Sequence, residues 1–251
     1  MARLTAAVLL IGAVTSLGTA RSDSPDLVLI RPPRIAKDIA AMPQIAHPAN
    51  DAQRRINAAL KRLDTAVAVA APDCRKDAQG PDAAAAYWAR KVDAPMAGPG
   101  YLSIVITDDA FCGGAHPNTA TMSIVYDLRT GRPVDWAKLL PPSLTGKIAL
   151  AKGMDGTRMV TLTSPELLKL YLDAYRHSDS GRDAECMDAV TPGDPPASMV
   201  WLDAKQHGLA VQFDLSHVVQ NCAIPMIIPA SVLRAKGADA SMIAAIEAAG
   251  K

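Results

Sequence analysis

Aromatic side chains are scarce in this 251-residue sequence, which contains 2 Phe, 3 Trp and 5 Tyr, or 4% in all. Grooves that bind single-stranded nucleic acid or sugars rely on stacked aromatic rings, and few rings are present to form such a platform. Hydrophobic residues still make up 49% of the chain, so a core built mainly from aliphatic side chains is expected.

The sequence also lacks an excess of charge of either sign, with 26 basic and 25 acidic residues. Arg3 is the only charged residue among the first twenty, so a chain without that segment has a formal net charge of zero. Proteins that bind phosphate backbones normally carry a basic excess or a basic stripe. We therefore expect no nucleic-acid partner.

The first twenty residues, MARLTAAVLLIGAVTSLGTA, have the pattern of a secretory signal peptide. Arg3 supplies the basic start, and Gly18 and Ala20 are the small residues before the cleavage point. The apolar run between them is shorter than the roughly 20 residues that span a bilayer. We expect a periplasmic or secreted protein with no membrane span after signal cleavage; a retained N-terminal anchor is the alternative.

The four cysteines, Cys74, Cys112, Cys186 and Cys222, are widely spaced and form no C-x-x-C pair. In an exported protein such a set indicates two disulfides rather than a zinc or redox site. Three pairings are open, and Cys74–Cys112 with Cys186–Cys222 is favoured because each bridge joins neighbouring segments. Each bridge would close a loop of roughly 40 residues, worth about 4 kcal/mol in the chain-entropy model.

Strands are indicated by a hydrophobic period of two in residues 101–106 and 122–126, followed by the turn sequence DLRTG. ASMVWLD and LAVQFDL, joined by a turn containing Gly208, predict a hairpin, and AIPMIIP a further strand. A helix is predicted over 50–69, with Asn50 as N-cap, Gln53 completing a capping-box-like pair, and the sequence APDC as its end. Residues 76–100 are rich in Ala, Pro and Gly and predict a loop or a change of lobe.

Further helices are predicted from Ser164 onward, with Pro165 at the first helical position, and in two Ala-rich segments divided by Gly237. The expected fold class is therefore α+β. An antiparallel sheet, built as a meander and hairpins, is packed by a few amphipathic helices and stapled by disulfides.

The stretch CGGAHPN raises the question of an active site. Cys112 and His116, with Asp108 or Asp109, contain the residue types of a nucleophile, a base and an orienting acid. An oxidised cysteine cannot be the resting nucleophile, so a structural corner is favoured, in which the glycines allow a sharp reversal. No catalytic residue, metal ligand or cofactor is assigned, because no ligand spacing or nucleotide motif is present.

GGAHPN, followed by SIVYDLRTGRPV and DWAKLL, resembles a domain of unknown function found at the C-terminal end of the anti-sigma factor RsiV. The same domain accompanies the peptidoglycan deacetylase PdaC. The segments PELLKLYL, GLAVQFDL and IPMIIPASVL fit it as well, and AHPANDAQRRINAALKRL looks like its smaller N-terminal companion. The expected division is residues 1–20 as signal peptide, 21–95 as companion lobe and 96–251 as the RsiV-like C-terminal domain.

The resemblance implies an extracytoplasmic α+β module, which in RsiV binds lysozyme. The sequence lacks the His-x-x-x-His motif of the deacetylase domain, so deacetylation does not carry over. The function expected is a non-enzymatic binding module of the cell envelope that recognises lysozyme, another envelope protein or cell-wall glycan. The alternative is an envelope hydrolase with an unrecognised site. The candidate binding residues are those of the motif, Gly113, Gly114, His116, Pro117 and Asn118.

Overall fold

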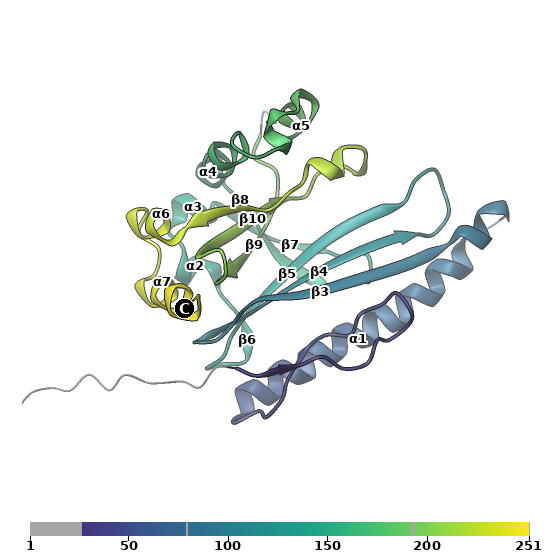
Figure 1. Cartoon of the computed structure of the whole chain (residues 1–251), viewed down its shortest axis with the longest axis horizontal. Helices are drawn as coiled ribbons and strands as arrows, with labels where there is room; N and C mark the ends of the chain where they lie inside the picture. The colour runs from purple at the N-terminus through teal and green to yellow at the C-terminus, as the bar shows by residue number, and fades with distance from the viewer. Residues whose placement is uncertain (1–26, 79, 192–193, 251) are drawn as a thin grey trace, which may run out of the picture.

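The computed structural model describes residues 27–78, 80–191 and 194–250 (Figure 1). The expected signal peptide, residues 1–20, lies outside the described residues. In chain order the strands are β1 Leu29–Ile30, β2 Gln44–Ile45, β3 Tyr87–Ala97, β4 Tyr101–Phe111, β5 Asn118–Asp127, β6 Arg132–Pro133, β7 Lys147–Lys152, β8 Arg158–Thr163, β9 Ser198–Asp203, β10 Gly208–Phe213 and β11 Met226–Pro229. The helices are α1 Asp51–Asp77, α2 Trp136–Leu139, α3 Pro142–Thr145, α4 Pro165–Tyr175, α5 Ala184–Val190, α6 Ala230–Ala235 and α7 Ala240–Ala249, with short 3-10 helices η1 Gly80–Ala85, η2 Ser180–Arg182 and η3 His217–Cys222.

The predicted antiparallel meander is confirmed as a sheet of order β3-β4-β5-β6. Leu102, Ile104 and Ile106 of β4 are completely buried on one face, as the period of two predicts. Gly131 closes the β5–β6 turn with a φ of 67°, a conformation that glycine adopts without strain. The expected α+β class with antiparallel pairing is therefore the observed one.

Helix α1 begins where the sequence predicts and ends later. The Asn50 side chain accepts a hydrogen bond from Gln53 N at 2.9 Å, and the Gln53 side chain accepts from Ala49 N at 2.7 Å. The expected end at residue 69 is wrong, because α1 continues through Pro72 to Asp77. Proline removes one helical hydrogen bond, but the last turns are held by burial of Ala71 and Cys74 against the first sheet.

The expected loop over residues 76–100 is also wrong in its second half, because β3 occupies Tyr87–Ala97. Its inward positions are Trp88, Arg90 and Val92, all buried. An arginine at a core-facing position breaks the apolar alternation by which a strand is recognised. The expected lobe boundary at residues 95 and 96 lies inside β3, which pairs with β4. The division into lobes stays a prediction.

The second sheet has the order β11-β10-β9-β8-β7, and the predicted β9–β10 hairpin is confirmed within it. Gly208 begins β10 rather than lying in the turn, where His207 has the positive φ of 54°. The β7–β8 hairpin was not predicted. β7 forms an outer edge of the sheet, with Lys147 and Lys152 at its ends and Ile148 and Leu150 exposed between them.

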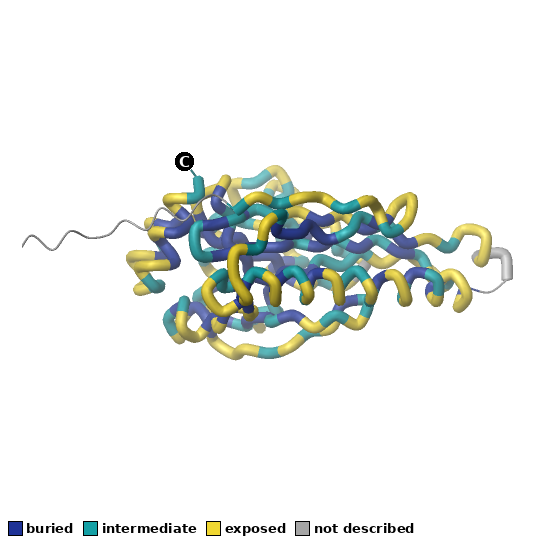
Figure 2. The backbone as a smooth tube through the Cα atoms, turned by 90° about the horizontal axis from the view of Figure 1, so that it is seen from below, coloured by how far each residue is buried: buried dark blue, intermediate teal, exposed yellow. Residues whose placement is uncertain are grey.

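The two sheets and α1 form layers, with α1 beneath the first sheet and the second sheet above it (Figure 1). Seen from below, α1 alternates buried and exposed residues along its length, as an amphipathic helix should (Figure 2). Ser123 Oγ of β5 donates to Val200 O of β9 at 3.0 Å, and Ala204 N donates to Pro95 O at 3.2 Å. These bonds tie the two sheets together. Within the described ranges, no helix has the length and apolarity needed to cross a membrane.

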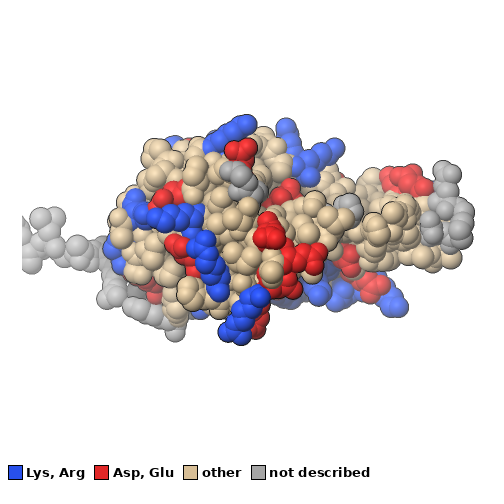
Figure 3. All heavy atoms as spheres, turned by 90° about the horizontal axis from the view of Figure 1, so that it is seen from above, with Lys and Arg blue, Asp and Glu red and all other residues tan. Residues whose placement is uncertain are grey.

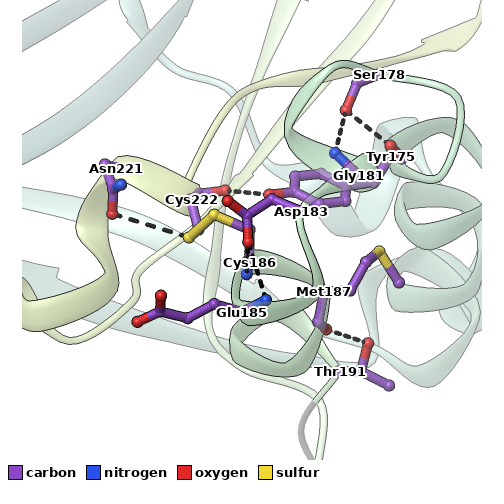
Figure 4. Close-up of a disulfide and its surroundings, with 10 residues drawn as sticks. All are labelled: Tyr175, Ser178, Gly181, Asp183, Glu185, Cys186, Met187, Thr191, Asn221 and Cys222. Carbon is purple, nitrogen blue, oxygen red and sulfur yellow. Dashed lines mark hydrogen bonds between the residues drawn. A yellow bond between two sulfur atoms is a disulfide. The ribbon is translucent and has the colours of Figure 1, made fainter.

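Both predicted disulfides are confirmed. Cys74 and Cys112 are bonded at 2.07 Å and join the end of α1 to the end of β4. Cys186 and Cys222 are bonded at 1.97 Å and join α5 to η3 (Figure 4). In the same view, the Tyr175 hydroxyl donates to Cys222 O at 3.0 Å, so α4 supports this bridge as well. Two disulfides fit an extracytoplasmic protein.

Candidate functional site

The conspicuous GGAHPN motif forms the tip of the β4–β5 hairpin. Gly113 and Gly114 have φ values of 86° and 100°, so the predicted glycine reversal is confirmed. His116 and Pro117 are exposed there, and Asn118 begins β5 with its side-chain amide 3.3 Å from Met154 Sδ. Residues 115–118 line a shallow hollow of about 300 Å³. A binding role for this tip stays a prediction.

The arrangement of Cys112, His116 and a carboxylate as nucleophile, base and orienting acid does not exist. Cys112 is in a disulfide, and the described residues include no free cysteine. Asp108 lies on the buried face of β4, bound to Arg90. Asp109 accepts a hydrogen bond from the Tyr87 hydroxyl at 3.1 Å. The described residues also contain no group of His, Cys, Asp and Glu side chains placed to hold a metal ion.

Substituting Gly114 with valine is expected to lower the free energy of unfolding by about 1–3 kcal/mol, because a β-branched residue is strained at positive φ. No atom lies within 4 Å of the added Cβ, so the cost comes from the backbone alone. Chemical denaturation measures it. The matched control is Ala115→Val in the same exposed turn, expected to stay within about 0.5 kcal/mol. Equal effects at the two positions would contradict the backbone explanation.

A larger and more polar site is a cleft of about 570 Å³ between the two sheets. Its residues come from β3, β4 and β5 on one side and from β9, β10 and the η3 region on the other. They are Arg31, Asp93, Ala94, Pro95, Val105, Thr107, Thr119, Thr121, Trp201, Asp203, Lys205, Gln212, Gln220, Ala223 and Pro225.

The strand period explains why polar side chains meet in this cleft. The apolar face of β4 and β5 is covered by α1, so the alternate residues face the second sheet. Thr107 and Thr121 are directly paired across β4 and β5. A register shift in β3 between Asp93 and Met96 bends that strand at the cleft wall, and Pro95 lies in the shift, where a missing N–H is tolerated.

The cleft keeps much of its hydrogen-bonding capacity unused. Gln212 is committed, since its Nε2 donates to Thr121 Oγ1 at 3.2 Å and to Ala223 O at 2.7 Å. By contrast, the side chains of Asp93, Thr107 and Lys205 make no hydrogen bond or ion pair to another described residue. A ligand here would meet a carboxylate, which accepts hydrogen bonds, an ammonium group, which donates them, and a hydroxyl, which does both.

Beneath the cleft, on the other face of the first sheet, lies a fully buried ion triad. Arg90 donates from Nε to Asp108 Oδ1 at 2.6 Å and from Nη2 to Asp155 Oδ2 at 2.7 Å. Trp88 Nε1 also donates to Asp108 at 3.0 Å. Burial alone would lower the pKa of Arg90, but its hydrogen bonds to the two carboxylates and their negative charges outweigh burial and raise that pKa. The triad joins β3, β4 and the β7–β8 turn, so its role is structural.

Sequence reasoning missed the cleft entirely. Its residues come from segments between residues 31 and 225, and none forms a motif with a fixed spacing. A signal for it was present in β4 and β5, where Thr107, Thr119 and Thr121 follow the strand period on the face opposite the apolar residues. A row of threonines on one sheet face is equally typical of a solvated surface, and only the second sheet turns that face into a cleft.

No family model matches this chain, and no curated protein matches it. Among the solved structures that resemble it is a DUF3298 family protein from Pseudomonas aeruginosa PAO1, with a TM-score of 0.44 and 14% identity, covering 62% of this chain and 64% of that one. Another is a DUF3298 family member from Bacteroides fragilis NCTC 9343, with a TM-score of 0.47 and 14% identity, covering 81% of this chain and 75% of that one. The similarity thus spans less than two thirds of the Pseudomonas protein. These neighbours are DUF3298 family proteins, but at these values they assign neither family nor function to this chain, and the resemblance to the RsiV and PdaC domain stays a prediction.

Proposed function

We propose that this protein is an exported, non-enzymatic binding module of the cell envelope that holds a fragment of cell-wall material in the cleft between its sheets. The observation that carries the proposal is the set of unengaged polar groups, Asp93, Thr107 and Lys205, around a cavity of about 570 Å³. A muropeptide presents hydroxyls, amides, carboxylates and amino groups together. Each of these groups finds a complementary partner in the cleft.

The cleft favours recognition by hydrogen bonds over ring stacking. Among the described residues of its lining Trp201 is the one aromatic residue, and it is only 5% exposed, so it offers little ring surface to a sugar. The volume lies within the roughly 300–1,000 Å³ typical of small-ligand sites. One or two sugar rings with part of a stem peptide fit this size better than a long polysaccharide.

The test is titration of the protein with purified soluble muropeptides by isothermal calorimetry. Thr107→Val is expected to weaken binding about threefold to tenfold, the value of one neutral hydrogen bond. Lys205→Met is expected to weaken it about tenfold or more, since a charged donor is lost. Lys37→Met is the matched control, because Lys37 is an exposed lysine outside the cleft lining.

Unchanged affinity in both cleft variants would show that the cleft is not the site. The same titration with His116→Ala tests whether the hairpin tip takes part. Release of new reducing ends or free amines during incubation with intact peptidoglycan would instead favour the hydrolase alternative. That outcome would contradict the non-enzymatic part of the proposal even if the cleft variants lose binding.

A second candidate, a cationic envelope protein such as lysozyme as partner, is favoured by an acidic area of the surface. Seen from above, acidic side chains gather near the middle of the molecule, and basic ones are spread around them on both sides (Figure 3). Glu185 and Asp188 of α5 are exposed and form no ion pair with another described residue. Glu185→Gln with Asp188→Asn should weaken binding to lysozyme measurably at low salt and leave muropeptide binding unchanged.

A further inference from the structure

A second cavity, of about 440 Å³, lies on the opposite face of the first sheet, in a groove between α1 and the β7–β8 hairpin. Ile124 and Tyr126 of β5 form its floor, Leu63 of α1 lines one wall, and Leu150 and Val160 line the other. The groove is thus bounded by a helix, a sheet and a hairpin. A cavity bounded on three sides suits a single small molecule better than the extended surface of a protein partner.

Much of the lining is apolar, and the apolar area continues outward onto the surface. Leu150 is 64% exposed, and Ile148 on the same strand is 43% exposed. Removal of apolar area from water stabilises a complex and offsets the entropic costs of binding. A ligand whose apolar chain extends beyond the cavity and covers these side chains would therefore bind more tightly.

The charges available at the groove are all positive. Of its three charged residues, Asp155 is committed, since its side chain is fully buried and bound to Arg90 at 2.7 Å. Arg62 and Arg158 are exposed and make no hydrogen bond or ion pair with another described residue. Two unpaired guanidinium groups at the rim of an apolar cavity complement one anionic group, which arginine binds with a planar pair of donors.

Tyr126 adds a polar group to the floor. Burial raises the pKa of this phenol to about 12, and the nearby positive charge of Arg62 opposes the rise only in part. The hydroxyl therefore stays protonated at neutral pH and offers a neutral donor beside the guanidinium. An anionic head group would find hydrogen-bond donors here. A cationic head group would find no free carboxylate among the described lining residues, because Asp155 is bound to Arg90.

We propose that this groove binds a soluble amphipathic anion, a molecule with a single apolar chain and a carboxylate or phosphate head group. The chain lies against Leu63, Ile124 and Val160, and the head group lies at the rim with Arg62 and Arg158. The site is separate from the cleft between the sheets, and its ligand class does not depend on the function proposed for that cleft.

The experiment is calorimetric titration of the full exported chain with laurate below its micelle concentration. Saturable binding at one site is expected. Combining Arg62→Gln with Arg158→Gln should weaken laurate binding on the order of tenfold or more, since charge-assisted bonds are lost. Lys61→Gln is the matched control, because Lys61 is the exposed neighbour of Arg62 outside the groove lining. Thermal melting of each variant verifies that it is folded.

Dodecyltrimethylammonium has a chain of the same length and the opposite charge, and it should bind far more weakly than laurate. Equal affinity for the two amphiphiles, or an unchanged laurate affinity in the double arginine variant, would overturn the proposal. So would binding to anionic phospholipid vesicles without binding to monomeric laurate, which would indicate a membrane surface as partner. Concentration-dependent dimerisation that the arginine substitutions abolish, without laurate binding, would reassign the groove to self-association.

Discussion

Replacing Arg90 with methionine is expected to lower the free energy of unfolding by about 3–5 kcal/mol, because removal of one member of a buried ion group leaves uncompensated charge. Among the described residues, Arg90 is the only cation that forms an ion pair with Asp108 or Asp155, and all three side chains are fully buried. Without it, two buried carboxylates are left in the protein interior without their cationic partner. Urea denaturation followed by circular dichroism measures the change.

Arg129→Met is the matched control for this substitution. Arg129 pairs with Asp127 at 3.0 Å, but its side chain is 79% exposed, so its loss should cost less than about 1 kcal/mol. A cost near that of Arg129→Met would show that the triad contributes little beyond packing.

Removing the Cys186–Cys222 bridge by substituting both residues with alanine is expected to lower the free energy of unfolding by about 2–5 kcal/mol. The bridge closes a separation of 36 residues and holds η3 against α5. η3 contributes Gln220 to the cleft, so we also expect weaker muropeptide binding than in the parent. Differential scanning calorimetry and the binding titration measure the two effects on the same sample.

The matched variant removes Cys74 and Cys112, whose bridge closes a similar separation of 38 residues at the far end of the long hairpin. This variant should lose a comparable amount of free energy of unfolding. It should keep its affinity for muropeptides, because neither residue lines the cleft. If this variant loses muropeptide binding while the variant without Cys186 and Cys222 keeps it, the assignment of the site to the cleft is wrong.

The regular elements could be predicted where one face is apolar and the other polar. β4 and β5 follow this rule, and so does the first half of α1, because each buries one row of side chains. The disulfide pairing was also predictable, since each bridge joins segments that neighbouring elements bring together. The strands and the helix can be predicted from local sequence because the burial of one face sets their hydrophobic period.

The remaining features depend on contacts between distant segments. β3 was missed because Arg90 occupies a core position. A buried arginine is tolerated there because Asp108 of β4 and Asp155 of the β7–β8 turn accept its hydrogen bonds. The β7–β8 hairpin was missed because its edge strand exposes Ile148 and Leu150. The cleft was missed for a related reason, since its polar groups come from two sheets and converge only after these sheets pack.

The outer position of β7 has a consequence for the behaviour of the protein at high concentration. A free sheet edge can recruit the same strand of another molecule and start aggregation. In an antiparallel pair of two β7 strands, Lys147 of one copy would oppose Lys152 of the other, so like charges would meet at both ends. The formal net charge of the chain is only +1, so repulsion between whole molecules is weak. These two lysines therefore oppose the association of two β7 edges and so favour colloidal stability.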